Sequence, residues 1–425
     1  MKTSELLRAV KAGEKDTALK SLYGEEALSF QRERYAAAIS EFAALHGERE
    51  VSVYTVAGRS EISGNHTDHN FGRVIAASID LDIIAVVSPS EHHMIRVKSE
   101  GFPEDIVDLT DDKVYESKYF SSGALISGVC KGFRNAGYRV GGFLAYTTSN
   151  VLKGSGLSSS AAFEDMIGNI LNYLYNDGKI DNVEIAKISQ YAENVYFGKP
   201  CGLMDQVACA VGGFVAIDFA DPKAPVVEKM DFDLTGKGYC LCIVSTGGNH
   251  ADLNEDYASI PAEMKAVAAY FGKPVLRGIT RDEVIAAIPA LRTTVGDRAI
   301  LRALHFLAEN DRVTAQTAAL EKGDLDAFFA GVLASGASSF RYLQNVYTTK
   351  NVSEQGLSLA LNLCEGFLSE KGGAWRVHGG GFAGTVQAYV KAEDIPAFRA
   401  LIDGAFGEGA CHVLKVRPVG AGKVL

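Results

Sequence analysis

Hydrophobic and polar positions alternate between two periods along the chain, which predicts both helices and strands. Residues 35–45 carry apolar side chains at helical spacing, and residues 51–56 then alternate as a strand does. A helical stripe runs from Phe163 until the turn residues 176–178 end it, and a second helix is predicted over 183–195. A short strand follows at 214–219, so the pattern predicts a mixed α and β protein.

The length of the chain and a proline-containing segment near its middle predict two domains. A chain of 425 residues exceeds one ordinary hydrophobic core, and a cleft between two lobes is the natural place for a site. Residues 221–225 (DPKAP) interrupt both periodicities, and we place the boundary there. The predicted domains are 1–220 and 221–425.

Composition and charge narrow the class of protein. Apolar residues make up 47% and charged residues 22%, which is typical of folded globular proteins. The net charge of -10 disfavours nucleic-acid binding, and charges interrupt the most apolar stretch before it reaches the length of a membrane span. The seven scattered cysteines suit free thiols in a reducing compartment, and the N-terminus lacks the apolar core of a secretory signal. We therefore expect a cytoplasmic protein with no nucleic-acid or membrane partner; the pattern does not indicate an oligomeric state.

A loop of small residues, 153–162 (KGSGLSSSAA), runs directly into the helix that begins near Phe163. Glycines allow a ligand to approach the backbone, and the N-terminus of a helix favours an anion such as phosphate. The loop matches neither GxxxxGK[ST] nor GxGxxG. Taken alone, it is as consistent with a serine-capped turn as with a phosphate site.

Three further segments concentrate polar residues or glycines. Residues 58–70 (GRSEISGNHTDHN) follow the first strand and could contact sugar hydroxyls or form a solvated loop. Residues 201–206 (CGLMDQ) place one acidic side chain, a possible helix cap, among apolar neighbours. Residues 376–385 (RVHGGGFAGT) bring three glycines before a strand, which suggests close approach of the backbone to a ligand or a tight turn.

Taken together and in this order, the four segments resemble the galactokinase branch of the GHMP kinases. They are similar to the galactokinase signature GRxNLIGEHTDYN, the ATP loop PxGxGLSSSA, the segment CGxMDQ and the loop MTGGGFGG. The resemblance spans roughly residues 51–390. It implies a two-lobed α+β GHMP kinase fold, with ATP and sugar in the cleft between the lobes, and transfer of the γ-phosphoryl group of ATP to the anomeric hydroxyl of galactose.

The resemblance also implies the residues of the site. Asp205 is expected to be the base and Arg59 to stabilise the transferring phosphoryl group. The phosphates of ATP are expected on the loop, and Mg²⁺ is expected on Ser160 and Glu193. The loop residues are Gly154, Ser155, Gly156, Leu157, Ser158, Ser159 and Ser160. The residues expected to line the sugar pocket are Asn65, His66, Asp68, Gly202 and Tyr257.

The chain departs from the signature inside the segment that is expected to contact the sugar. Asn65 stands in place of Glu and His69 in place of Tyr, while Leu152 and His378 replace Pro and Thr of the later motifs. Asn carries no charge and would repel a carboxylate less than Glu does. Galacturonic acid and N-acetylgalactosamine are therefore alternative substrates, and a non-catalytic galactose sensor is an alternative of another class.

Overall fold

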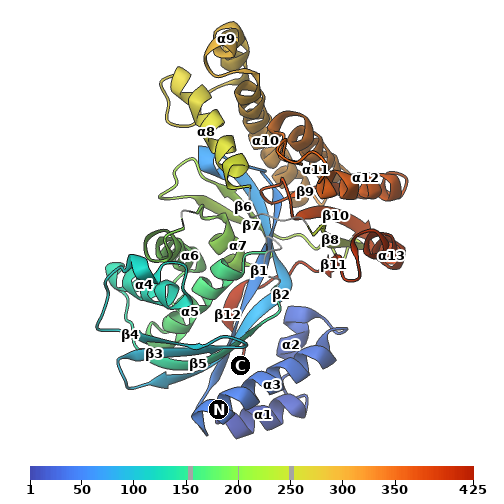
Figure 1. Ribbon diagram of the computed structural model, residues 1–425. Helices are drawn as coiled ribbons and strands as arrows, with labels where there is room; N and C mark the ends of the chain where they lie inside the picture. The colour runs from blue at the N-terminus through green and yellow to red at the C-terminus, as the bar shows by residue number, and fades with distance from the viewer. Residues whose placement is uncertain (152–156, 200, 248–252) are drawn as a thin grey trace.

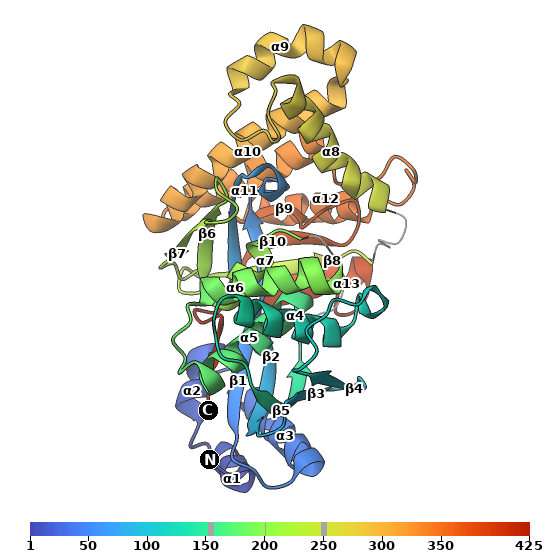
Figure 2. The same cartoon turned by 90° about the vertical axis from the view of Figure 1, so that its left-hand side faces the viewer.

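The computed structural model describes residues 1–151, 157–199, 201–247 and 253–425. It confirms an α+β fold, in which one sheet runs through the lower part of the molecule and a second lies beside helices of the upper part (Figures 1 and 2). Both chain ends lie at the base of the first part (Figure 1).

The first sheet has eight strands, and two long ones form its centre. β1 and β2 pair antiparallel along most of their length. The order of the main path is β12 (Ala421–Lys423), β1 (Ser52–Ser63), β2 (Arg73–Ser90), β5 (Gly142–Ser149), β3 (Met94–Ser99) and β4 (Glu104–Asp108), with β6 (Phe214–Asp218) on β2 and β7 (Val226–Met230) on β6.

Side chains from the two faces of this sheet enter two different cores. Val53 and Val86 pack against the N-terminal helices, while Tyr54 and Val87 face the helices on the opposite side. This alternation follows from the period of two along a strand. The N-terminal helices are α1 (Thr3–Lys11), α2 (Asp16–Tyr23) and α3 (Leu28–His46), and the opposite helices are α4 (Ser122–Asn135), α5 (Ser159–Tyr175), α6 (Asn182–Tyr191) and α7 (Met204–Val211).

A buried ion pair explains how the most apolar stretch of the chain carries an aspartate. Asp82 lies in β2 with no exposed surface, and both Arg34 and Arg417 bind it, at 2.6 and 2.8 Å. Two guanidinium partners compensate the desolvation of the carboxylate. The pair with Arg417 ties the C-terminal segment to the centre of the first sheet.

The second sheet has four strands. Its order is β11 (Cys411–Leu414), β8 (Tyr239–Ser245), β10 (Thr385–Lys391) and β9 (Ala374–His378). The helices that pack against it are α11 (Leu325–Ser338), α12 (Gly356–Leu368) and α13 (Ile395–Phe406). The helices α8 (Asn254–Tyr270), α9 (Arg281–Thr294) and α10 (Asp297–Glu321) lie above it in Figure 1. Short single turns, η1 (Asp68–Asn70), η2 (Glu116–Lys118) and η5 (Ala392–Asp394), and two π-helical turns, η3 (Ala192–Phe197) and η4 (Ser339–Leu343), complete the elements.

The predicted elements that the pattern marked most clearly are present. The helix expected from Phe163 is α5, the strand expected at 214–219 is β6, and the strand expected at 51–56 is the start of β1. The helix expected over 183–195 is α6, which continues as the π-helical turn η3.

The division at residues 220 and 221 stays a prediction. Most strands and helices after it belong to the second part, but β7 pairs with β6 and β12 pairs with β1. The chain therefore re-enters the first sheet twice after the predicted boundary.

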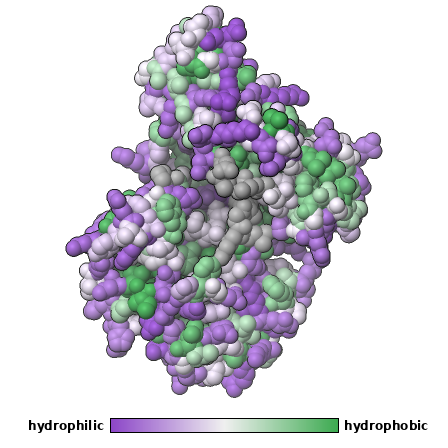
Figure 3. All heavy atoms as spheres, viewed as in Figure 1, coloured by the Kyte–Doolittle hydropathy of each residue, from purple (hydrophilic) through white to green (hydrophobic). Residues whose placement is uncertain are grey.

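The surface is mainly polar on the face shown in Figure 3, with apolar side chains gathered over α12. Leu359, on this helix, is 52% exposed. Across the part of the chain that the structure describes, no helix has both the length and the apolar character of a membrane span.

Candidate functional site

Arg59 and Asp205, which lie far apart in the sequence, meet in the structure. Arg59 is on β1, and Asp205 is in the first turn of α7. The Nε and Nη2 atoms of Arg59 both lie 2.7 Å from Oδ1 of Asp205, and the Ser158 hydroxyl donates to Oδ2 at 2.6 Å. Each carboxylate oxygen therefore has a donor, and the signature strand, the serine loop and the CGLMDQ segment join at one point.

The surroundings of Asp205 keep its carboxyl group ionised. Burial by itself would raise the pKa of Asp205, but the charge of Arg59 and the hydrogen bonds from Arg59 and Ser158 outweigh it, so the pKa lies below its ordinary value. The Asp205 side chain is still 35% exposed. It is therefore a charged acceptor that a ligand can reach.

Ser158 adopts a backbone conformation that few residues other than glycine adopt. Its φ of 58° is in the left-handed region, and it stands immediately before the first residue of α5. The backbone N–H of Arg59 donates to the carbonyl oxygen of Leu157 at 3.1 Å. The turn before α5 is thus attached to β1, and Ser158 is directed at Asp205.

Glu193 and Ser160, the two residues predicted to hold a cation, are neighbours. The Ser160 hydroxyl donates to Oε1 of Glu193 at 3.2 Å, and Lys199 Nζ lies 3.1 Å from the same oxygen. Gln206 donates to Oε2 at 2.8 Å. Glu193 lies in the π-helical turn η3, a local widening that often occurs at functional sites.

Two further carboxyl groups, which sequence reasoning missed, lie under this cluster. Glu164 and Asp165 on α5 have no exposed surface. Burial, followed by the charge of Glu193, raises the pKa of both well above the ordinary value. Their position inside the apolar stripe of the predicted helix was the available sequence signal.

Three consecutive carbonyl groups of the glycine loop accept hydrogen bonds, two from the sugar signature segment and one from Tyr257. Asn65 donates to the oxygen of Gly379 at 2.7 Å, His66 to that of Gly380 at 3.0 Å, and Tyr257 to that of Gly381 at 2.8 Å. The first and fourth predicted segments therefore form one unit, and Tyr257 on α8 belongs to it.

Asn65 itself is fully buried, and each of its side-chain atoms is bonded to protein. Its Oδ1 accepts from Ser339 at 3.2 Å and from Asn345 at 2.8 Å, while Nδ2 also donates to Oε1 of Glu61 at 3.1 Å. Sequence reasoning placed Asn65 in the sugar pocket, and the structure shows that its buried side-chain amide is hydrogen-bonded to four protein groups. A role through its neighbours fits these contacts better than direct binding.

Glu61 is a functional candidate that sequence reasoning missed, although the signature contains the clue. The signature has Asn at this position and Glu four residues later, whereas this chain has Glu61 and Asn65. Relative to the signature, the carboxylate and the amide have exchanged places, and here they are hydrogen-bonded to each other. The relocated carboxylate accepts from Arg376 at 2.6 Å, and Arg376 is 1% exposed.

Asp68 and Gly202, both predicted to line the sugar pocket, lie next to each other. A β-carbon added at Gly202 would lie 2.6 Å from Oδ2 of Asp68, so glycine leaves room for that carboxylate. Burial raises the pKa of Asp68, and His66 opposes the change.

The two histidines that depart from the family motifs are uncharged; His378 is buried and His69 is partly buried. His378 contacts Ser60 at 3.1 Å through Nε2 and Thr385 at 2.9 Å through Nδ1. Burial lowers the pKa of His378 and of His69 to about 3. Both are neutral hydrogen-bonding groups at physiological pH.

Leu157, Ser158, Ser159 and Ser160 of the predicted phosphate loop belong to the described structure. The loop residues Gly154, Ser155 and Gly156, together with Leu152, lie outside the described residues.

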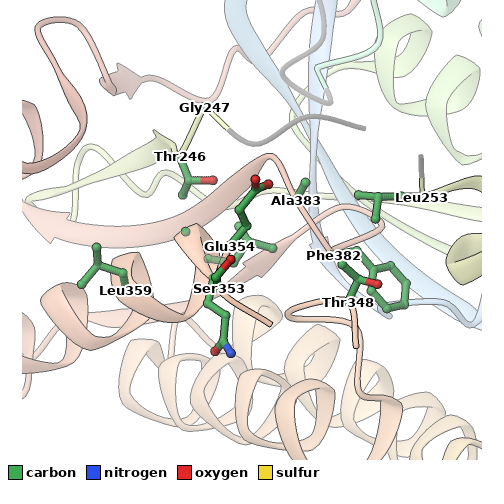
Figure 4. Close-up of a pocket in the computed structure, with 12 residues that line it drawn as sticks. Thr246, Gly247, Leu253, Thr348, Ser353, Glu354, Leu359, Phe382 and Ala383 are labelled. Atoms are coloured by element: carbon green, nitrogen blue, oxygen red, sulfur yellow. The ribbon is translucent and has the colours of Figure 1, made fainter. Parts of the chain in front are cut away.

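A cavity of about 540 Å³ adjoins the sugar segment but does not contain the Arg59–Asp205 pair. Figure 4 shows Ser353 and Glu354 between Thr246 on one side and Phe382 on the other. The Phe382 ring stands edge-on to the ring of Tyr257, with centroids 5.4 Å apart. The cavity thus shares one wall with the unit formed by the signature and the glycine loop.

Solved structures with the same fold include a galactokinase and a mevalonate kinase. The crystal structure of Lactococcus lactis galactokinase complexed with galactose has a TM-score of 0.76 at 24% identity, covering 92% of this chain and 100% of that chain. Methanococcus jannaschii mevalonate kinase has a TM-score of 0.60 at 14% identity, covering 87% and 99%. The fold is thus the two-lobed GHMP kinase fold.

Sequence comparison gives the family within that fold. The GHMP kinases N terminal domain matches residues 124–213, and the galactokinase galactose-binding signature matches residues 40–89. The galactokinase of Streptomyces coelicolor is 32% identical over 378 residues, which are 88% of this chain and 94% of that protein. The galactokinase of Clostridium tetani is 28% identical over 369 residues, 87% and 91%. The chain belongs to the galactokinase family, whose members are ATP-dependent sugar kinases.

Proposed function

We propose that this protein transfers the γ-phosphoryl group of ATP to the anomeric C1 hydroxyl of galactose. The observation that carries the proposal is the contact of Arg59 and Ser158 with Asp205, at 2.7 and 2.6 Å, where the signature strand meets the turn before α5. Family membership supports the same reaction.

Asp205 is the proposed base. Its lowered pKa keeps the carboxylate ready to accept a proton from the anomeric hydroxyl. As that proton moves to Asp205, the sugar oxygen forms a bond to the γ-phosphorus, the bond to the β-phosphate oxygen breaks, and ADP leaves. Arg59 stabilises negative charge on the group in transfer, an electrostatic contribution typical of phosphoryl transfer.

The phosphates of ATP are proposed to lie along residues 154–160, at the N-terminus of α5. The helix has 17 residues, and its free N–H groups favour an anion there.

Ser160 and Glu193 are proposed to hold Mg²⁺. Within the described residues, no group of three or more His, Cys, Asp or Glu side chains could hold a metal ion. Mg²⁺ nevertheless fits, because it commonly uses one or two protein oxygens together with water and phosphate. When bound, it would neutralise charge on the phosphates. Lys199, which forms an ion pair with Glu193, would add a second positive charge beside that of Mg²⁺.

The sugar is proposed to contact His66, Asp68, Gly202 and Tyr257, with Asn65 supporting them from behind. Galacturonic acid and N-acetylgalactosamine remain alternative substrates, and a non-catalytic sensor remains an alternative class. The buried, protein-bonded side chain of Asn65 favours neither sugar alternative. A cytoplasmic location also stays a prediction, consistent with seven free cysteines.

The test is ADP release from the purified protein with ATP, Mg²⁺ and single sugars. We expect turnover with galactose and none with homoserine or mevalonate. Turnover only with galacturonic acid or N-acetylgalactosamine would reassign the pocket. No turnover, together with calorimetrically measured galactose binding, would favour the sensor.

A further inference from the structure

A groove lined by three arginines lies on the upper helices, away from the Arg59–Asp205 pair. Its volume is about 430 Å³, and α9, α10, α11 and η4 all contribute to it. Arg281, Arg312 and Arg341 line it together with Leu304, Ser338 and Tyr342. The volume is within the range of small-molecule sites.

The charged side chains that line the groove are all positive. Its lining residues, all in the described part of the chain, include no acidic side chain. Arg281 and Arg341 are exposed, and neither takes part in an ion pair with another described residue. Glu283, in the same turn of α9 as Arg281, is engaged by Thr280 in the capping box.

Arg312 links the groove to the buried carboxylate of Glu309. Its Nε donates to Glu309 at 2.8 Å, but its buried Nη2 has no hydrogen-bond partner within the described structure. A buried donor without a partner is costly, so a turn of the Arg312 side chain toward an anion in the groove would break no hydrogen bond at Nη2.

We propose that this groove binds a phosphorylated small molecule. Guanidinium groups recognise phosphate through paired hydrogen bonds, and three of them around one groove would bind a dianion. The apolar floor, which includes Leu304, and the ring of Tyr342 suit a carbon skeleton attached to the phosphate.

Two short hydrogen-bond chains connect the groove to the sugar segment. In the first, Ser338 donates to His305 at 2.9 Å, and His305 donates to the carbonyl oxygen of Asn65 at 3.0 Å. In the second, Arg312 holds Glu309, whose Oε1 accepts from the backbone N–H groups of Gly64 and Asn65, both at 3.3 Å. An occupant that moves Ser338 or Arg312 therefore alters the support of the sugar pocket.

The binding test uses phenyl phosphate as the probe and isothermal titration calorimetry on the full chain, with the catalytic site filled by galactose and a non-hydrolysable ATP analogue. We expect saturable binding in the millimolar range or tighter, weakened about tenfold by the double variant Arg281→Ala/Arg341→Ala. Arg292→Ala, also on α9 but ion-paired to Asp297, is the control and leaves binding unchanged.

Several outcomes would overturn the site: no saturable binding, equal binding to the double variant, or equal binding of uncharged benzyl alcohol. Binding of an acidic peptide without binding of phenyl phosphate would assign the groove to a protein partner instead.

The coupling has its own readout, the calorimetric affinity for galactose with and without phenyl phosphate. We expect a change of at least about twofold in the wild type and none in the double variant. Unchanged galactose affinity would refute the coupling. This readout rests on the proposed function, because it needs galactose to bind. The binding test is decided by the difference between the wild type and the double variant, which does not need galactose to bind, so the two can fail separately.

Discussion

The exchange of carboxylate and amide between Glu61 and Asn65 predicts that these positions are energetically coupled. Three variants test it: Glu61→Asn, Asn65→Glu, and the double variant that restores the order of the family signature. The native chain has one carboxylate and one amide at positions 61 and 65, next to Arg376. Glu61→Asn leaves two amides there, and Asn65→Glu leaves two carboxylates. The double variant again has one carboxylate and one amide, at exchanged positions.

The magnitudes follow from burial. Glu61→Asn leaves the guanidinium of Arg376, 1% exposed, without its carboxylate, which costs about 3–5 kcal/mol of unfolding free energy. Asn65→Glu places a second buried carboxylate against Glu61 and removes the donor to Gly379, at a similar cost of about 3–5 kcal/mol.

In the double variant, a carboxylate at 65 would accept from Asn345, Ser339 and the new amide at 61. We therefore expect the double variant to be more stable than the sum of the single effects predicts, by at least about 2 kcal/mol. The extra methylene at 65 is common to both Asn65→Glu proteins and cancels in the cycle.

The assay is urea unfolding of the four proteins, followed by circular dichroism, with the KM for galactose measured in parallel. As a control cycle, Glu61→Asn is combined with Gly366→Ala, an α12 position where an added β-carbon meets nothing within 4 Å, and these effects must add. Single effects of Glu61→Asn and Asn65→Glu that add to within about 0.5 kcal/mol would refute the coupling.

Two further predictions concern the same unit. In Gly381→Ala, a residue in the left-handed conformation (φ 83°) would carry a β-carbon 1.9 Å from the carbonyl oxygen of Asn345. We therefore expect about 2–5 kcal/mol of destabilisation in urea unfolding and a raised KM for galactose. A change no larger than that of Gly366→Ala would contradict this. Burial lowers the pKa of His305 from its ordinary 6.5 to about 4, so the folded state binds this proton less well than the unfolded state, and stability is lost as pH falls from 6.5 toward 4. His305 contributes about 2 kcal/mol of the loss at pH 5, and His305→Gln should reduce the difference between urea unfolding at pH 7 and pH 5 by that amount; an unchanged difference would show that His305 is not the group.

The sequence predicted the parts of the fold and site that depend on local pattern. The stripe from Phe163 and the strand before Gly58 predicted elements that the structure contains. The family resemblance placed Arg59 and Asp205 in one site, and the structure shows the two in contact.

The remaining features depend on contacts between distant segments. The return of β7 and β12 to the first sheet has no local signal, because strand pairing is settled by the whole core. The burial of Asn65 likewise depends on Asn345 and Ser339, some 280 and 274 positions away. A polar loop next to a strand looks solvated until its partners are known.

The most direct test of the central claim is the turnover of Asp205→Asn with galactose, alongside calorimetric galactose binding. The variant keeps the shape of the side chain and loses the ability to take a proton. The account predicts that kcat falls by about 10²-fold or more while galactose still binds. Turnover near the wild-type rate would contradict the assignment of Asp205 as the base.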